Sequence, residues 1–266
     1  MARLIGANEQ LAYSITTPFQ LITMTKPAIL IVPGSFAPPS IYKDIVEHLR
    51  KAGFQAVALR TPSTLKRMPL PPATMSDDAS AIKGAVEAVI AQGKEVVDDQ
   101  VVCHSYGGTP TTQALAGLKV KRIVYLTAIV PKLGQSNVEA MGGEKGVLPM
   151  EATEGYLHID ATMMAAAVCN DLSWDVGYEH CLNLAHHSAA AFLEEVTQVA
   201  YKDIPVSYIF CENDLVVTPK QQEGFINVIA EATGKGVDVV NLPYGHCPNW
   251  SAPEKVAEIV EQLAMK

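Results

Sequence analysis

Short apolar runs alternate along the chain with longer segments in which apolar residues recur every three or four positions. The first such pair is AILIV at 28–32 and then IYKDIVEHLRKAG, whose Ile41, Ile45 and Leu49 have helical spacing before Gly53 ends the segment. Further strand-like runs are FQAVAL (54–59), DQVVCH (99–104), RIVYLTAIV (122–130), VSYIFC (206–211) and VDVVNL (237–242). Strands that are apolar along their whole length and alternate with helices predict a doubly wound, mostly parallel α/β sheet covered on both faces.

The helical segments between these runs carry start and stop signals. Helices are expected over 75–93, 106–118, 219–234 and 251–266. In the first of these, Ser76 is the expected N-cap, because Asp77 and Asp78 follow it in the first turn, where acidic side chains are favourable. The run FQAVAL is expected to form a second buried strand.

The segment 131–201 breaks the alternation, because it contains no strand-like run and is rich in Ala, Met and His. We expect it to form inserted helices, which divides the chain into a core of 1–130 and 202–266 and a helical cap of 131–201. An insertion of this size is a candidate lid. Met163, Met164 and Trp174 of the cap, with Phe36 of the core, are candidates for an apolar substrate pocket, although residues at helical spacing also serve as core packing.

Composition and charge narrow the class of partner. With 48% hydrophobic and 18% charged residues the chain is globular, and its net charge of −8 disfavours nucleic acid or an anionic membrane as the main partner. A small-molecule substrate is expected instead. We expect no targeting signal, because the N-terminal MARLIGANEQ has no basic region followed by a sustained apolar run. No apolar stretch approaches the roughly 20 residues of a membrane-spanning helix.

The cysteines and histidines do not indicate a disulfide framework or a metal site. The five cysteines are an odd number without CxxC spacing, which favours a reducing compartment, and a cytoplasmic protein is therefore expected. The pair His186 and His187 is isolated from other ligand types. No metal ion or organic cofactor is expected.

The stretch QVVCHSYGGTP (100–110) has the features of a nucleophile elbow. Such an elbow needs a buried strand, a sharp turn flanked by small residues, and a helix whose N-terminus points at the reacting group. Gly107 and Gly108 supply the small residues after Ser105, whereas Cys103 occupies the position that is usually the first glycine of G-x-S-x-G. By itself this motif leaves open whether Ser105 is a nucleophile or a structural serine at the end of a strand.

A base and an acid at suitable positions favour the nucleophile. Of seven histidines, only His246 follows a predicted strand and precedes the last helix, at the carboxyl edge of the sheet where Ser105 is also expected. His104 adjoins the serine and is expected to point away from it. The loop after VSYIFC offers Glu212 and Asp214, and we choose Asp214 because it lies further past the strand. The order Ser105, Asp214, His246 is that of one class of serine hydrolase.

Two backbone N–H groups are expected to bind the oxyanion that forms in acyl transfer. One belongs to Tyr106, directly after the nucleophile. The other comes from the loop VPGSF, where Gly34 permits a close approach and Ser35 follows. Both donors are main-chain groups, so the Ser35 hydroxyl needs no role in catalysis.

Four motifs, in this order along the chain, resemble the α/β-hydrolase superfamily: AILIVPGSF, CHSYGG, CENDLVVTP and YGHCPNWSAPEKVAEIV. More narrowly, they resemble the branch that contains plant methyl esterases, hydroxynitrile lyases and pyrethroid-hydrolase-like esterases. The segment VCNDLSWDVGYEHCLNLAHHSAAAF is also similar to the cap of the last group. The resemblance implies that Ser105 is the nucleophile, Asp214 the acid and His246 the base, and that Ser35 and Tyr106 provide the oxyanion donors.

Two departures from the family pattern bear on the chemistry. Pro33 replaces the histidine that the family commonly has before Gly34, which keeps the glycine. The hydroxynitrile lyases carry threonine at the position of Gly34 and lysine directly after the catalytic histidine, where this chain has Cys247. Cleavage of cyanohydrins is therefore not expected. Cys103 and Cys247 either lie near the site and make it sensitive to thiol reagents or serve as inert packing.

The expected function is that of a serine hydrolase that cleaves a small, largely apolar carboxylic ester or lactone through an acyl-enzyme intermediate. Two alternatives stay open. One is a non-hydrolytic enzyme of the same fold, such as a lyase, dehydratase or cyclase in a biosynthetic pathway, and the other is a ligand receptor with little turnover. A product to which no water has been added would indicate the first, and tight binding with slow turnover the second.

Overall fold

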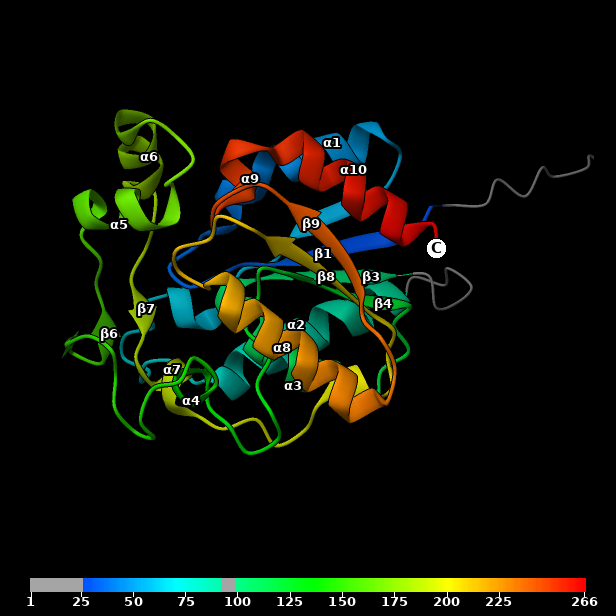
Figure 1. Cartoon of the computed structure of the whole chain (residues 1–266). Helices are drawn as coiled ribbons and strands as arrows, with labels where there is room; N and C mark the ends of the chain where they lie inside the picture. Colours follow the sequence, from blue (N-terminus) through cyan, green and yellow to red (C-terminus); the bar gives the residue numbers. More distant parts are fainter. Residues whose placement is uncertain (1–25, 92–98) are drawn as a thin grey trace, which may run out of the picture.

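A parallel sheet of six strands forms the centre of the computed structural model, which describes residues 26–91 and 99–266 (Figure 1). The strands lie in the order β2 (Gln55–Ala58), β1 (Ala28–Val32), β3 (Gln100–His104), β4 (Arg122–Leu126), β8 (Val206–Cys211) and β9 (Asp238–Leu242). Every neighbouring pair is parallel. The predicted α/β class with a mostly parallel central sheet is confirmed.

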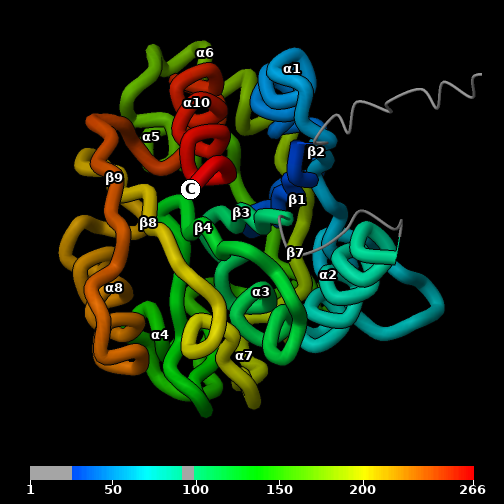
Figure 2. Tube along the Cα trace, turned by 90° about the vertical axis from the view of Figure 1, so that its right-hand side faces the viewer, coloured from blue at the N-terminus to red at the C-terminus, as the bar shows by residue number. Residues whose placement is uncertain are grey.

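Helices cover both faces of the sheet (Figures 1 and 2). Consecutive residues of β1 point to opposite faces, so Ile31 belongs to one apolar core and Leu30 to the other. The layer on the Ile31 face consists of α1 (Lys43–Lys51) and α10 (Pro253–Ala264). The layer on the Leu30 face consists of α2 (Met75–Ile90), α3 (Gly108–Ala114) and α8 (Pro219–Thr233).

Burial explains why the inner strands read as continuous apolar runs. Every side chain of β1 and β3 is buried, because helices cover both faces. In β2, at the edge of the sheet, exposed and buried side chains alternate, and Val57 is 40% exposed. The expectation that FQAVAL is a buried strand is therefore wrong, because an edge strand is only partly covered by the helix layers.

The N-terminus of α2 also differs from the prediction. Thr74 is its N-cap instead of Ser76: the Thr74 hydroxyl accepts a hydrogen bond from the Asp77 N–H at 3.2 Å, and the Asp77 carboxylate accepts one from the Thr74 N–H at 3.0 Å. This reciprocal capping box satisfies two donors that a helix end leaves unpaired. Ser76 lies in the first turn and its hydroxyl donates to Glu194 at 2.6 Å.

The register brings the carboxyl ends of the central strands together at one edge. Val32 pairs with Cys103, Cys103 with Tyr125, and Tyr125 with Tyr208. Several short helical segments follow strands at this edge: η1 (Pro39–Tyr42), η2 (Pro62–Thr64), η3 (Ser105–Gly107) and α9 (Pro248–Ser251). In open α/β sheets, ligands bind at this edge.

The chain between β4 and β8 contains helices and a small second sheet. Its elements are α4 (Asn137–Ala140), β5 (Ala152–Thr153), β6 (Tyr156–Leu157), α5 (Ala161–Val168), α6 (Trp174–Cys181), β7 (His187–Ser188), α7 (Ala190–Leu193) and η4 (Ala200–Lys202). In Figure 1, α5 and α6 lie beyond the end of the main sheet. The antiparallel sheet β5–β6–β7 was not expected, because strands of two residues are too short to produce a periodic pattern. The division into a core and a 131–201 cap stays a prediction.

The structure bears on part of the membrane prediction. Among the helices of residues 26–91 and 99–266, none is long and apolar enough to cross a membrane. The expectation about the N-terminal MARLIGANEQ, and the predicted end of the second helix at 93, lie outside the described residues.

Candidate active site

Ser105 lies at the turn between β3 and the following helix, and its backbone has a positive φ of 52°. A non-glycine residue in this region is strained, and such strain is concentrated at functional sites. The two glycines after it make the turn possible. A Cβ on Gly107 would lie 2.5 Å from the Pro33 carbonyl oxygen, and a Cβ on Gly108 would overlap the Ile129 carbonyl. The turn exposes the Ser105 side chain to cavities at the sheet edge.

Cys103, which stands where the elbow motif usually has glycine, is a core residue of β3. Its side chain is fully buried, and its Sγ donates to the Val124 carbonyl at 3.6 Å. Burial raises the pKa of the Cys103 thiol well above its ordinary value, so the thiol stays protonated and unreactive. The structure therefore favours inert packing for Cys103 over sensitivity to thiol reagents.

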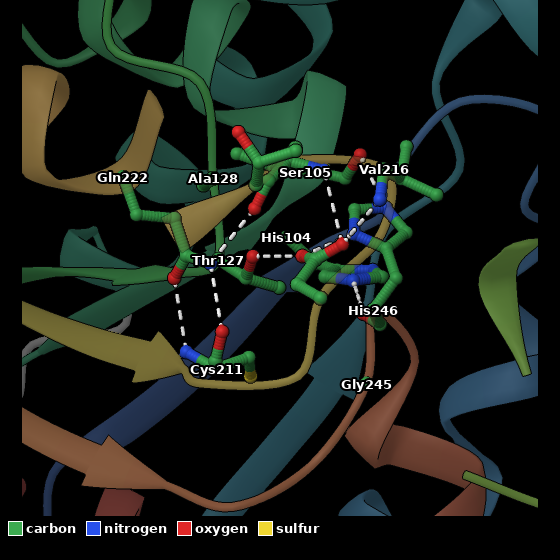
Figure 3. A network of polar contacts seen from close by, with 12 residues as sticks. His104, Ser105, Thr127, Ala128, Cys211, Val216, Gln222, Gly245 and His246 are labelled. Carbon is green, nitrogen blue, oxygen red and sulfur yellow. Dashed lines mark hydrogen bonds and ion pairs between the residues drawn. The ribbon is translucent and has the colours of Figure 1, made fainter. Parts of the chain in front are cut away.

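Ser105, Asp214 and His246 come together from three separate loops. His246 Nε2 lies 2.9 Å from Ser105 Oγ (Figure 3). His246 Nδ1 lies 2.7 Å from Asp214 Oδ2. When Asp214 is ionised, Nδ1 carries a proton and Nε2 accepts the hydrogen bond from the Ser105 hydroxyl. The three residues are 5%, 1% and 4% exposed, so these contacts are shielded from water. Glu212, the alternative carboxylate, is exposed.

The Asp214 carboxylate is surrounded by donors. Its Oδ2 accepts hydrogen bonds from His246 and the Thr127 hydroxyl, and its Oδ1 accepts from the N–H groups of Val216 at 2.7 Å and Val217 at 2.9 Å. Burial by itself raises the pKa of Asp214, but the charge of His246 and these hydrogen bonds outweigh burial and lower it below its ordinary value. Asp214 is therefore ionised at neutral pH and holds the His246 ring in one orientation.

The loop after β1 lies directly against Ser105. A Cβ on Gly34 would lie 3.1 Å from the Ser105 Cβ, so glycine is what lets the loop come this close. Within the described part of the chain, neither the Ser35 N–H nor the Tyr106 N–H donates a hydrogen bond to another protein group. Both residues line a cavity beside Ser105. These two N–H groups are thus available to a ligand.

The insertion between β4 and β8 holds the loops on both sides of Ser105. The Phe36 N–H donates to His187 Nδ1 at 3.2 Å, and the Phe36 carbonyl accepts from the Ala185 N–H at 2.7 Å. Burial lowers the pKa of His187 to about 3, so the ring stays neutral and Nδ1 remains an acceptor. On the other side, Asp171 Oδ2 accepts from the Gly245 N–H at 2.8 Å.

A buried chain of hydrogen bonds joins the loop after β1 to the backbone of His246. The Gly34 N–H donates to the Tyr42 hydroxyl at 2.9 Å, that hydroxyl lies 2.7 Å from His104 Nδ1, and His104 Nε2 lies 2.8 Å from the His246 carbonyl oxygen. A carbonyl can only accept, so Nε2 carries the proton and the Tyr42 hydroxyl donates to Nδ1. Burial and the neighbouring His246 lower the pKa of His104 to about 3, which keeps the ring neutral.

The sequence provided no signal for this role of His104. Its ring lies 5.0 Å from the His246 ring and supports that residue's backbone instead of contacting the Ser105 hydroxyl (Figure 3). Tyr42 and His246 are far apart in the sequence, and only the paired strand ends bring them to the same histidine. Hydrogen bonds between buried residues that are distant in the sequence leave no periodic pattern in the sequence that could predict them.

Two cavities meet at Ser105. The larger has a volume of about 470 Å³, and its apolar wall includes Ile129, Val138, Met141, Leu148 and Phe192. The smaller has a volume of about 50 Å³, and its apolar wall includes Phe36, Met164, Val168, Leu184 and Trp250. Ser35, Ser105 and Val216 border both.

Of the four residues predicted to line the substrate pocket, two line a cavity beside Ser105 and two do not. Phe36 and Met164 line the smaller cavity. Met163 and Trp174 line neither cavity: their side chains are 77% and 56% exposed, and the Trp174 ring stacks on Tyr178. The pocket prediction is wrong for these two, because successive helical residues point about 100° apart, so Met163 and Met164 face different surroundings.

Cys247 differs from Cys103 because it borders the site. It is 6% exposed and lines the smaller cavity beside His246. Burial raises the pKa of its thiol well above the ordinary value. In the described residues, no group of three or more His, Cys, Asp or Glu side chains is placed to hold a metal ion.

The sheet topology and this site define an α/β-hydrolase arrangement, and comparison with known families agrees. Residues 29–259 match the model of the Alpha/beta hydrolase family. The match spans most of the chain, so the chain belongs to this family.

Two related fungal proteins match nearly the full chain. Probable hydrolase R7 of Phoma sp. is 65% identical over 245 residues, which cover 91% of this chain and 99% of that protein. Alpha/beta hydrolase nvfD of Aspergillus novofumigatus is 30% identical over 256 residues, which cover 91% of this chain and 98% of that protein. The relatives support a hydrolase.

Solved structures share the fold at much lower identity. An extracellular α/β-hydrolase from a Paenibacillus species superposes with a TM-score of 0.71 at 17% identity, covering 89% of this chain and 98% of that one. The pyrethroid hydrolase PytH gives a TM-score of 0.69 at 19% identity, covering 91% and 98%. A methylesterase from Arabidopsis gives 0.68 at 15% identity, covering 90% and 99%. At these identities the likeness concerns the fold alone.

Proposed function

We propose that this chain is a serine hydrolase that cleaves a carboxylic ester or lactone with a largely apolar substituent through an acyl-enzyme on Ser105. The observation that carries the proposal is the continuous hydrogen-bonded set of Ser105 Oγ, His246 and Asp214, with distances of 2.9 Å and 2.7 Å. Such a set activates a serine hydroxyl, which is a weak nucleophile by itself. The relative named a hydrolase at 65% identity also supports it.

In the acylation step, Ser105 Oγ attacks the substrate carbonyl carbon while His246 Nε2 takes the hydroxyl proton. The carbonyl oxygen becomes an oxyanion and accepts hydrogen bonds from the Ser35 and Tyr106 N–H groups. Asp214, whose pKa is lowered, stays ionised and stabilises the imidazolium of His246. The tetrahedral intermediate then collapses, and His246 gives its proton to the leaving alkoxide.

Deacylation repeats these steps with water as the nucleophile. His246 Nε2 takes a proton from the water as its oxygen attacks the acyl carbon, and the same two N–H groups hold the second oxyanion. The proton then returns to Ser105 Oγ as the acid leaves. Every proton transfer in this cycle uses His246, and no group outside the described site is required.

The test is intact-protein mass spectrometry after treatment with a fluorophosphonate. We expect one covalent adduct on the wild type, none on Ser105→Ala, and a rate of adduct formation on His246→Ala lower by about 10³-fold or more. The control is circular dichroism, which should show that both variants fold. An adduct on folded Ser105→Ala would place the nucleophile elsewhere and end the proposal.

A second experiment separates hydrolysis from the lyase, dehydratase, cyclase and receptor alternatives. An ester is turned over in water enriched in ¹⁸O, and the acid product is weighed by mass spectrometry. Attack of water on the acyl-enzyme places one ¹⁸O in the acid. A product without the label, or stoichiometric binding without turnover, would contradict the proposed function.

A further inference from the structure

Ser105 lies where the two cavities join, and the cavities differ in size and in wall. The larger, of about 470 Å³, is in the range of small-molecule sites. The smaller, of about 50 Å³, is a third of the roughly 150 Å³ that accommodates benzene, so it accepts a group of about two or three heavy atoms. An ester bound at Ser105 must divide its two arms between them.

The position of His246 decides which arm enters which cavity. His246 borders the smaller cavity and not the larger one. After attack, its Nε2 must hand a proton to the leaving alcohol oxygen, which therefore has to lie on the His246 side of Ser105. The alcohol arm extends from that oxygen into the smaller cavity. The acyl arm, on the opposite side of the carbonyl carbon, extends into the larger cavity, which Tyr106 borders.

The side chains that border the larger cavity suit an apolar acyl arm. The larger cavity is bordered by aliphatic and aromatic side chains from several elements, among them Val138 of α4 and Phe192 of α7. A long apolar acyl group would bury its surface there, and the removal of that surface from water favours binding.

Apolar side chains from two helices border the smaller cavity. Met164 and Val168 of α5 form one side, and Trp250 of α9 forms another. The Trp250 indole is stacked on the His180 ring of α6 at 4.8 Å with an angle of 8°, which fixes its orientation. Met164 is the unbranched, flexible member of this wall, so its length sets the space beyond the alcohol oxygen.

We infer that the preferred substrate is an open-chain ester of a bulky apolar acid with an alcohol of one to three carbons, and that Met164 sets the limit on the alcohol. This inference rests on the proposed function and specifies it. It predicts strong asymmetry between esters that have the same atoms but exchange the lengths of their two arms.

The first measurement compares two isomers, methyl octanoate and heptyl acetate, by titration of the acid released by the wild type. We expect kcat/KM to be at least about 100-fold higher for methyl octanoate, because heptyl acetate places its long arm in the smaller cavity. In a series of octanoate esters, kcat/KM should fall steeply between the ethyl and the butyl ester.

The second measurement uses neighbouring methionines as test and control. Met164→Ala enlarges the smaller cavity and should raise the ratio of butyl octanoate to methyl octanoate hydrolysis about 10-fold. Met163→Ala removes a side chain that is 77% exposed and lines neither cavity, so it should leave that ratio unchanged. Val138→Trp in the larger cavity should lower the rate with methyl octanoate and spare methyl acetate.

The outcomes separate the inference from the proposed function. A preference for heptyl acetate, or an unchanged ratio in Met164→Ala, would overturn the assignment of the cavities while leaving the serine mechanism intact. Failure to hydrolyse either isomer while Ser105 still reacts with a fluorophosphonate would overturn the substrate class only. If Ser105 also fails to react, the proposed function itself is wrong.

Discussion

The sheet edge that carries Ser105 borders the smaller cavity together with α5, and α5 packs against α6. The sheet edge and this helix pair are held in different ways. At the sheet edge, Ser105, Asp214, His246 and His104 are all buried and each makes hydrogen bonds through its side chain. On α5 and α6, large apolar side chains such as Met163 face solvent, and the buried part is a small separate core. Hydrogen bonds hold the side chains at the sheet edge in defined positions. The helix pair contributes apolar side chains that limit the size of the smaller cavity.

The difference shows which substitutions each region tolerates. A hydrogen-bonded network loses its geometry when one donor or acceptor is removed, and the unpaired partner left behind is costly in a buried site. A wall of apolar side chains loses only contact area, in proportion to what is buried. The two regions meet at Asp171, which follows α5 and accepts the Gly245 N–H beside His246.

The largest expected effect comes from removing the charge that orients His246. Asp214→Asn should lower kcat about 10⁴-fold with little change in fold, because the amide favours the wrong tautomer of the imidazole. The measurement is steady-state hydrolysis of a short-chain ester. Glu212→Gln, in the same loop but exposed, is the matched control and should stay within twofold of the wild type. Equal losses in both variants would contradict the role of Asp214.

The elbow should be the least tolerant point of the backbone. Gly107→Ala places a Cβ 2.5 Å from the Pro33 carbonyl oxygen, and we expect the free energy of unfolding to fall by about 3 kcal/mol or more. In Gly84→Ala, on an exposed face of α2, the new Cβ meets no atom within 4 Å, and stability should rise by up to about 1 kcal/mol. Urea unfolding measures both. Similar stabilities would show that the elbow can relax.

The pH dependence of stability should report the carboxyl group beneath Tyr106. Asp78 accepts hydrogen bonds from the Tyr106 hydroxyl and the Ser63 N–H, each at 2.8 Å, but burial outweighs them and raises its pKa from 3.8 to about 6. The folded protein then holds this proton more tightly than the unfolded chain. Its contribution is present below the unfolded pKa and is lost as pH rises through about 6.

This difference in pKa corresponds to about 3 kcal/mol. From about pH 2 to about pH 8 the free energy of unfolding of the wild type should fall by that amount relative to Asp78→Asn, which cannot titrate, and about 2 kcal/mol of this fall should come between about pH 4 and about pH 6. Urea unfolding at each pH measures it. Parallel curves for the two proteins would show that Asp78 has an ordinary pKa.

A substitution in the buried series of hydrogen bonds from Gly34 through Tyr42 and His104 to His246 should have an intermediate effect on stability and activity. Tyr42→Phe removes the hydroxyl between the Gly34 N–H and His104 Nδ1 and leaves both unpaired, at a cost of about 1–3 kcal/mol. These hydrogen bonds position the loop after β1 and the backbone of His246. The rate of fluorophosphonate labelling of Ser105 should therefore also fall, by about 10-fold. A loss of stability with unchanged labelling would limit Tyr42 to a structural role.

The smallest effect is expected on the outer face of α5. Met163→Ser should change the free energy of unfolding by less than about 0.5 kcal/mol, because the side chain is 77% exposed. Val168→Ser, on the inner face of the same helix, should cost about 2 kcal/mol, because Val168 is 4% exposed in the small core of α5 and α6. Thermal unfolding of the pair measures the difference, and equal effects would mean that α5 is not packed on its inner face.

Patterns among neighbouring residues in the sequence were enough to predict the main sheet and the candidate catalytic residues. The apolar runs predicted all six strands of the main sheet and their alternation with helices, because hydropathic period and chain breaks are properties of neighbouring residues. Glycines at 107 and 108 and polar residues that follow three strands identified Ser105, Asp214 and His246 as candidates, with Glu212 as the alternative to Asp214. Parallel strands place such residues at one edge whatever the details of packing.

Only the tertiary structure decided the contacts that join distant segments. The exposure of one edge of the sheet followed from the helix layers. The link from Gly34 through Tyr42 and His104 to His246 depends on the sheet register. Hydropathy records that a side chain is apolar, but which cavity it borders depends on the rotation and placement of its helix. That is why Met164 lines the site and Met163 faces water.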